Sequence, residues 1–338
     1  MGWGRSRKSL AMVALGQVLS LLITGTGFTS SLLAQRGIDA PTAQAWSNYI
    51  LLALIYGGLV VYRRKKIEMP WYSFILLAFI DVEANYLAVK AYQYTSLTSV
   101  MLLDCWTIPF VIILTWLLLK THYSIGHFVG VGICVLGLVL VIFSDVHASD
   151  RSGGKNVLLG DMLVFGSSIL YAISNVSEEF LVKHVEQVEL VACLSSFGAV
   201  ISAFQLYMLE WHEIRRIHWT TGAILPFIGF AFSQFGFYTL VPILLQGSGS
   251  ALLNLSILTS DMWAVAIRAF VFRQRVDWLY FVAFGTVAGG LLIYSLCGEP
   301  VAADGLVSRE NPHVRENYEP VKVIDADLHD AGAEEEQL

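Results

Sequence analysis

Three charged side chains interrupt an apolar run of this sequence. The stretch FIDVEANYLAVKAYQY, residues 79–94, contains Asp81, Glu83 and Lys90 among side chains as apolar as those of a membrane-spanning helix. A charge at the centre of a bilayer costs about 2.5–3.5 kcal/mol on insertion scales, so such residues usually face the inside of a helix bundle or form pairs. Carboxylates at that depth could hold a proton or bind the polar groups of a solute.

The polar residues of this stretch form two stripes on a helix. At about 100° per residue, Asp81, Asn85 and Tyr92 lie within about 40° of one another. The second stripe, on roughly the opposite side, consists of Glu83, Tyr86, Lys90 and Tyr94. A helix that is polar on two sides belongs inside a bundle, and we expect it beside the fourth and ninth spans. Either stripe lines a water-filled cavity, or both form structural ion pairs and hydrogen bonds; the two alternatives stay open.

Polar residues recur at helical spacing in three further apolar segments. Asp104 in the fourth segment is close enough along the chain to pair with Lys90 across a hairpin. In the sixth segment two carboxylates, Glu178 and Glu179, are adjacent, so we expect one to face a cavity and the other to meet the cytosolic surface. In the ninth, Asn254, Asp261 and Arg268 recur every seven residues, which suits either an aqueous path or an internal ion pair.

The candidate site residues fall into two groups. Those expected to bind the solute or line its cavity are Asp81, Asn85, Tyr92, Asp104, Trp106, Tyr171, Asn175, Asn254 and Asp261. Those expected to form ion pairs or couple transport to protons are Glu83, Lys90, Glu178, Glu179 and Arg268. The eight histidines lack ligand spacing and no catalytic or phosphate-loop motif is present, so we expect no enzyme activity, metal or cofactor.

The composition indicates a membrane protein. Of the 338 residues, 56% are hydrophobic and only 14% are charged. Ten apolar windows are long enough to cross a bilayer; they run approximately over residues 10–33, 43–62, 70–92, 97–119, 125–144, 158–182, 188–209, 221–242, 248–271 and 277–296. The first resembles a signal peptide but is too long and has no convincing cleavage site, so we interpret it as a retained helix.

Basic residues predict the orientation. In the first half they concentrate at the N-terminus and in the second and fourth loops, which places both termini in the cytosol. The basic loops of the second half would then lie on the other side, a conflict that two inverted five-helix repeats resolve. We therefore predict an all-α membrane protein with an N-terminus over 1–9, halves over 10–144 and 158–296, a linker over 145–157, and an acidic tail over 297–338.

The tail carries eleven acidic residues against three basic ones, so we expect a disordered cytosolic extension. The tail either only keeps the chain soluble or mediates the function itself, in which case the protein would be a non-transporting membrane scaffold or sensor that acts through the tail. The predicted partners are a small solute and the lipid bilayer, without nucleic acid, and a homodimer stays an alternative. The membrane is an endomembrane or the plasma membrane.

Three stretches carry a family resemblance: VKAYQYTSLTSVMLLDCWTIP, GDMLVFGSSILYAISNVSEEFLVK and LLNLSILTSDMWAV. They resemble the solute carrier 35 family, subfamily F, of the drug/metabolite transporter superfamily, over about residues 10–296, and the linker SDVHASDRSGG is similar to plant members. The resemblance implies ten helices in inverted halves and alternating access to a central cavity, so the expected function is secondary transport of a small polar organic solute.

Relatives in the nucleotide-sugar branch have a ninth-helix motif G-A-L-N-K. Here GSALLNLS keeps Asn254 but has Leu255 where the lysine would stand. This departure favours a less charged solute, such as a nucleoside or a nucleobase-like compound, with Golgi nucleotide-sugar/nucleotide exchange as the alternative.

Overall fold

The computed structural model of the chain describes residues 2–38, 40–63, 69–91, 94, 103–104, 106–147, 157–217, 219–260, 262–263 and 278–297. Its elements are helices: α1 (Gly2–Gln35), α2 (Pro41–Leu52), η1 (Ala53–Gly57), α3 (Gly58–Arg63), α4 (Trp71–Ala91), α6 (Thr107–Leu118), α7 (Ile125–His147), α8 (Val157–Val182), α9 (Gln187–Leu209), α10 (Trp211–Arg216), α11 (Thr221–Ile257) and α13 (Trp278–Leu296). Each of the ten predicted spans overlaps a described helix, and residues 95–102 at the start of the fourth and 264–277 at the end of the ninth lie outside the described residues. The second is the succession α2, η1 and α3, and α11 contains the eighth span and the start of the ninth.

The outer surface of these helices suits a lipid environment. Five are long and apolar enough to cross a membrane: Ser9–Ser30, Pro41–Arg63, Leu158–Val182, Gln187–Leu209 and Thr221–Ile257. Large apolar side chains on the outside are exposed, among them Leu54, Leu76, Ile113, Leu117, Leu136 and Phe204. Helices satisfy their own backbone hydrogen bonds, which the hydrocarbon core requires. The prediction of an all-α membrane protein is confirmed.

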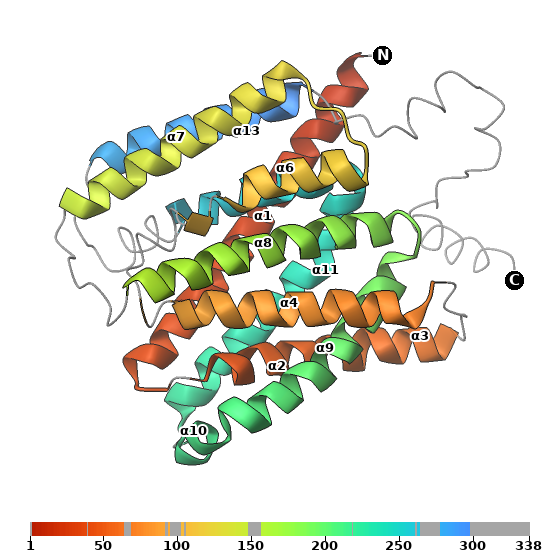
Figure 1. Cartoon of the computed structure of the whole chain (residues 1–338), viewed down its shortest axis with the longest axis vertical. Coiled ribbons are helices and arrows are strands. Elements are labelled where there is room, and N and C mark those ends of the chain that lie inside the picture. Colours follow the sequence, from red (N-terminus) through yellow and green to blue (C-terminus); the bar gives the residue numbers. More distant parts are fainter. Residues whose placement is uncertain are drawn as a thin grey trace, which may run out of the picture.

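Helices that are distant in sequence pack together. In Figure 1, α7 and α13 lie side by side at one edge of the bundle, and α4 and α8 lie side by side in its middle. The main neighbour of α1 is α11, and α2 packs against α9. The sequence prediction that the third span lies beside the fourth and ninth is corrected here. The main neighbours of α4 are α8 and α9, the sixth and seventh spans, because these helices supply polar partners for both of its stripes.

Small residues allow α7 and α13 to cross with their backbones close together. A Cβ on Gly130 would lie 2.8 Å from the backbone nitrogen of Tyr294 and 2.9 Å from the carbonyl oxygen of Gly290. A side chain at either glycine would therefore push the two helices apart.

A buried carboxylate holds the start of α2 against the end of α9. The backbone N–H groups of Thr42 and Ala43 donate to the two oxygens of Glu210, at 2.8 and 3.0 Å. The first N–H groups of a helix have no intrahelical acceptor, and a negative charge is favourable at that end. Glu210 thus fastens the connection between two helices at one end of the bundle.

We expect Glu210→Ala to destabilise the protein by about 1–3 kcal/mol, because two backbone donors lose a charged acceptor in a buried place. The measurement is the thermal unfolding midpoint of the detergent-purified protein. Glu213→Ala on α10 is the control, since Glu213 is an exposed residue whose ion pair with Arg216 spans 3.5 Å. Equal shifts for the two variants would contradict the assignment.

Candidate functional site

Four helices meet at a buried carboxylate. The hydroxyls of Tyr49 on α2 and Tyr238 on α11 donate to Asp81 Oδ2 at 2.6 and 2.7 Å, and Ser174 on α8 donates to Oδ1 at 3.4 Å. The two tyrosine hydroxyls lie 3.3 Å from each other. These four residues are here called the central cluster. Asp81 is 8% exposed and lies at the midpoint of α4, so the cluster is at the middle of a spanning helix.

Hydroxyl donors stabilise this buried carboxylate. Hydrogen bonds to an ionised acceptor are roughly twice as strong as neutral ones. The rings of Tyr49 and Tyr238 also pack with their centroids 5.8 Å apart, which fixes the hydroxyls on one side of Asp81. The cluster joins four helices that are distant in sequence, α2, α4, α8 and α11.

Amide side chains extend the polar interior along α4 and α8. Asn85 donates to the backbone oxygen of Asp81 at 2.8 Å and accepts from the hydroxyl of Tyr171 at 3.1 Å. Asn175 donates to Asn254 Oδ1 at 3.1 Å. Five of the predicted cavity residues therefore form polar contacts inside the bundle: Asp81, Asn85 and Tyr171 in one set, and Asn175 and Asn254 in another.

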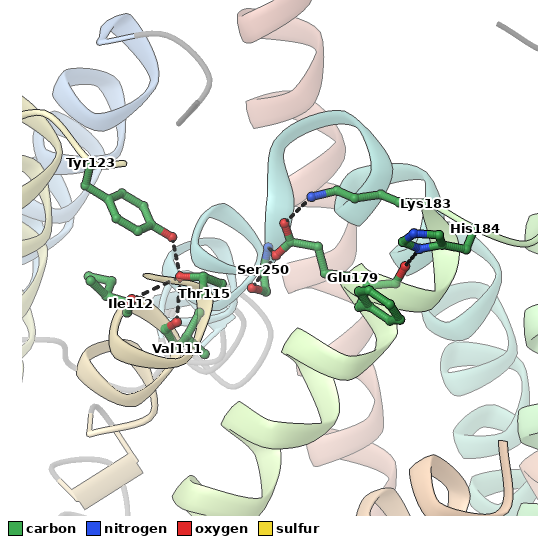
Figure 2. A network of polar contacts seen from close by, with 9 residues as sticks. Val111, Ile112, Thr115, Tyr123, Glu179, Lys183, His184 and Ser250 are labelled. Carbon is green, nitrogen blue, oxygen red and sulfur yellow. Dashed lines mark hydrogen bonds and ion pairs between the residues drawn. The ribbon is translucent and has the colours of Figure 1, made fainter. Parts of the chain in front are cut away.

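A second polar group lies at the end of the bundle that contains Lys183, Gly249 and Tyr123, here called the Lys183 end (Figure 2). Lys183 donates to Glu179 Oε1 at 2.7 Å, and the backbone N–H and hydroxyl of Ser250 donate to Oε2 at 2.7 and 2.6 Å. Gly249, with φ +81° and ψ 174°, breaks α11 just before Ser250. Glu179 thus caps the helix that begins after the break.

The position of Glu179 corrects one sequence prediction. One of the adjacent carboxylates was expected at the cytosolic surface, but Glu178 and Glu179 are 5% and 4% exposed. The broken part of α11 packs at the end of α8 and offers Glu179 two donors from Ser250, and Lys183, directly after α8, supplies the third. Glu178 points elsewhere, and its Oε1 has no hydrogen-bond partner in the part of the chain that the structure describes.

Tyr123 belongs to the same end, in the connection between α6 and α7. Its hydroxyl lies 2.7 Å from Thr115 Oγ1, as Figure 2 shows. Burial raises the pKa of Tyr123 to about 12, so the phenol stays neutral and the contact does not change with physiological pH. Thr115 also donates to the carbonyl oxygen of Val111, which anchors this connection to α6.

Other predicted residues lie outside the central cluster. Glu83 accepts from Gln205 of α9 at 3.0 Å, and Lys90 donates to the hydroxyl of Tyr86 at 2.7 Å. Asp104 accepts from Thr107 and Ser168 at 3.4 and 3.5 Å. Trp106 is half exposed and packs against Phe110 and Phe165. Tyr92, Asp261 and Arg268 lie outside the described residues.

Sequence reasoning missed Tyr49, Ser174 and Tyr238. Tyr238 had one signal, because Tyr86 and Tyr238 lie 152 residues apart, close to the spacing expected between matching positions of the two predicted halves. Tyr49 and Ser174 are single polar residues in apolar spans, and only the packing of the four helices shows that they converge on Asp81.

These observations define a multi-pass helical membrane protein whose spans enclose a buried polar centre, the arrangement in which membrane carriers bind solutes. The model of solute carrier family 35 matches residues 5–296, and the chain belongs to this family of membrane transporters, in its subfamily F. Solute carrier family 35 member F2 of Mus musculus is 38% identical over 299 residues, 86% of this chain and 79% of that protein.

More distant proteins are similar to this chain in sequence or in fold. The UDP-galactose transporter homolog 1 of Candida albicans is 22% identical over 232 residues, 64% of this chain and 61% of its own length. A solved crystal structure with 13% sequence identity superposes with a TM-score of 0.69, covering 85% of this chain and 97% of the other, and supports the fold alone. The predicted family and transporter class are confirmed, and the likeness to plant members stays a prediction.

Proposed function

We propose that this protein is a gradient-driven secondary transporter that carries a small polar organic solute across a membrane by alternating access. The observation that carries the proposal is the central cluster. A buried carboxylate at mid-membrane, bonded to residues from three other helices, is expensive to maintain and is usually functional in membrane proteins. Both termini lie in the cytosol in this proposal, as the basic loops predict.

The packing of the helices supports two inverted repeats of five. In such a repeat the second span corresponds to the seventh and the fifth to the tenth, and corresponding spans can pack against each other across the symmetry axis. The second and seventh spans, α2 and α9, do pack together, and so do the fifth and tenth, α7 and α13. The same correspondence maps the pair of α4 and α8 onto α11 and α1, which also pack together. In inverted-repeat transporters the solute binds where the halves meet near the midplane, which is where Asp81 lies.

The charges around the central cluster favour a solute without phosphate. The described acidic residues in this part of the interior are Asp81 and Glu178, and the negative charge of Asp81 would repel a diphosphate. The residue after Asn254 is Leu255, which is fully buried and offers no cation. Tyrosine and asparagine side chains suit the hydrogen-bonding groups of a nucleoside or a nucleobase-like compound.

A panel uptake measurement tests the proposal. The full-length protein in proteoliposomes is given radiolabelled adenosine, guanosine, adenine, guanine, UDP-galactose and GDP-mannose. We expect at least one nucleoside or nucleobase to accumulate above protein-free vesicles, and the nucleotide sugars to stay outside. Exchange of a nucleotide sugar for internal nucleotide would instead support the Golgi alternative, which the likeness to the Candida protein favours. No uptake of any compound would favour the scaffold.

A further inference from the structure

Glu178 is a buried carboxyl group whose surroundings do not suit a negative charge. It is 5% exposed, and its Oε1 has no hydrogen-bond partner among the described residues. Its neighbour Glu179, buried to a similar degree, has three donors from Lys183 and Ser250. An ionised carboxylate that is buried without partners costs several kcal/mol, so the contrast indicates that the two groups differ in charge.

Asp81 makes ionisation of Glu178 still less favourable. Ser174, one turn before Glu178 on α8, donates to Asp81, so the two carboxyl groups share one side of α8. If both were ionised, their like charges would repel each other. Asp81 already has three hydroxyl donors, whereas Glu178 has none among the described residues. Asp81 is therefore the member of the pair that suits a negative charge.

The helices packed around Glu178 contribute no described cation to it. The charged residues of α4 are Asp81, Glu83, which accepts from Gln205, and Lys90, which donates to Tyr86. The titratable residues of α2 and α11 are the tyrosines of the central cluster, and α6 has none over 107–118. The acidic residue of α9, Glu189, has Cys193 as an electrostatic neighbour. Directly after α8, Lys183 is bonded to Glu179. The described residues also contain no group of three ligands that could hold a metal ion.

We propose that Glu178 binds a proton and that the pair of Asp81 and Glu178 is the proton-coupling site of the transporter. The inference rests on the proposed function. Hydronium on one side of the membrane gives its proton to the Glu178 carboxylate and becomes water; on the other side the carboxylic acid returns the proton to water. Glu178 lies four residues from the end of α8, about 6 Å along the axis, between Asp81 and the Lys183 end.

Glu178 Oε1, which has no described hydrogen-bond partner, also determines whether solute and protons move in the same or in opposite directions. A proton neutralises Glu178, and a hydrogen-bond donor of the solute stabilises its charged form, so the two compete for the same group. The carrier crosses with either one, whereas an empty carrier with ionised Glu178 does not cross. This competition produces exchange of solute for protons, so solute entry drives proton exit.

A measurement without any solute tests the proton site. Infrared difference spectra of the detergent-purified, full-length protein are recorded over a pH series, in which a protonated carboxylic acid shows a carbonyl stretch that a carboxylate lacks. We expect a band that Glu178→Gln removes and that Glu83→Gln retains, because Glu83 accepts from Gln205 outside the cluster. Persistence of the band in Glu178→Gln, or its loss in Glu83→Gln, overturns the assignment.

Folding of each variant is checked by a monodisperse profile in size-exclusion chromatography. If Glu178→Gln aggregates, Glu178→Asp replaces it in the infrared measurement. Aspartate keeps a carboxyl group at a different reach, so it should shift the band in frequency. An unshifted band in Glu178→Asp overturns the assignment to Glu178.

Proton movement is measured in proteoliposomes with a trapped pH-sensitive dye, using whichever of adenosine, guanosine, adenine or guanine accumulates. Solute entry should make the lumen more alkaline, and Glu178→Gln should abolish this change while Glu213→Gln on α10 leaves it intact. Uptake with a constant luminal pH, or with acidification, would contradict solute–proton exchange but would still support transport. An infrared band assigned to Glu178, together with no uptake of any panel compound, would contradict the proposed transport function but would still support proton binding by Glu178.

Discussion

Replacing Asp81 by asparagine is expected to reduce solute uptake by at least about tenfold while the protein still folds, since about 1.4 kcal/mol corresponds to a factor of ten. The amide oxygen still accepts from Tyr49 and Tyr238, and the amide nitrogen can donate to Ser174, so no buried hydroxyl is left unpaired. What disappears is the negative charge. A hydrogen bond to a charged group contributes roughly 1 kcal/mol more than a neutral one, and two strong bonds are affected. Initial uptake rates and the thermal unfolding midpoint measure the two effects separately.

The control for Asp81→Asn is Asp161→Asn, the same exchange near the other end of α8 and outside the central cluster. A double-mutant cycle of Asp81 and Tyr238 tests whether the loss of uptake comes from the interaction between these two side chains. If the tyrosines act through Asp81, then Tyr238→Phe should cost much less in Asp81→Asn than in the native protein, because interacting groups are not additive. Fully additive losses, or an Asp81→Asn variant with native uptake, would show that the charge of Asp81 has no part in transport.

The sequence predicted the spans of this protein well, because membrane helices are defined by local composition. The ten apolar windows and the polar residues within them need only the sequence and the thickness of a bilayer. The two stripes of α4 were also predictable, since they follow from helical geometry. Asp81 and Asn85 do face a polar interior, and Glu83 does meet a neighbouring helix.

The partners of those residues could not be predicted in the same way. Which helix packs against α4 depends on the shape of all the spans, and α8 and α9 supply partners that lie more than 90 residues away in sequence. Tyr49 has no local feature that distinguishes it from a lipid-facing tyrosine. Glu178 and Glu179 are adjacent in sequence. Only the fold shows that Glu179 caps the helix after the break in α11, whereas Glu178 Oε1 has no hydrogen-bond partner among the residues that the structure describes.

Gly249→Ala is expected to destabilise the protein by about 1–3 kcal/mol, because the backbone at this position adopts a conformation that is essentially restricted to glycine. Gly249 has φ +81° and ψ 174°, and this break directs the next helix so that Ser250 reaches Glu179. A Cβ at Gly249 would also lie 3.0 Å from Glu179 Oε1, crowding the carboxylate that caps the helix. A lower thermal unfolding midpoint and reduced uptake are the measurements.

Two further variants separate backbone conformation from crowding at Gly249. Gly132→Ala on α7 is the matched control, because a Cβ there meets no atom within 4 Å, so this change should leave the unfolding midpoint nearly unchanged. Gly249→Asn tests the conformation itself. Asparagine tolerates the left-handed helical region, where ψ is about +47°, but ψ at Gly249 is 174°. Asparagine should therefore destabilise at least as much as alanine. If Gly249→Asn is as stable as the native protein, the backbone is an ordinary left-handed turn and the break in α11 does not need glycine.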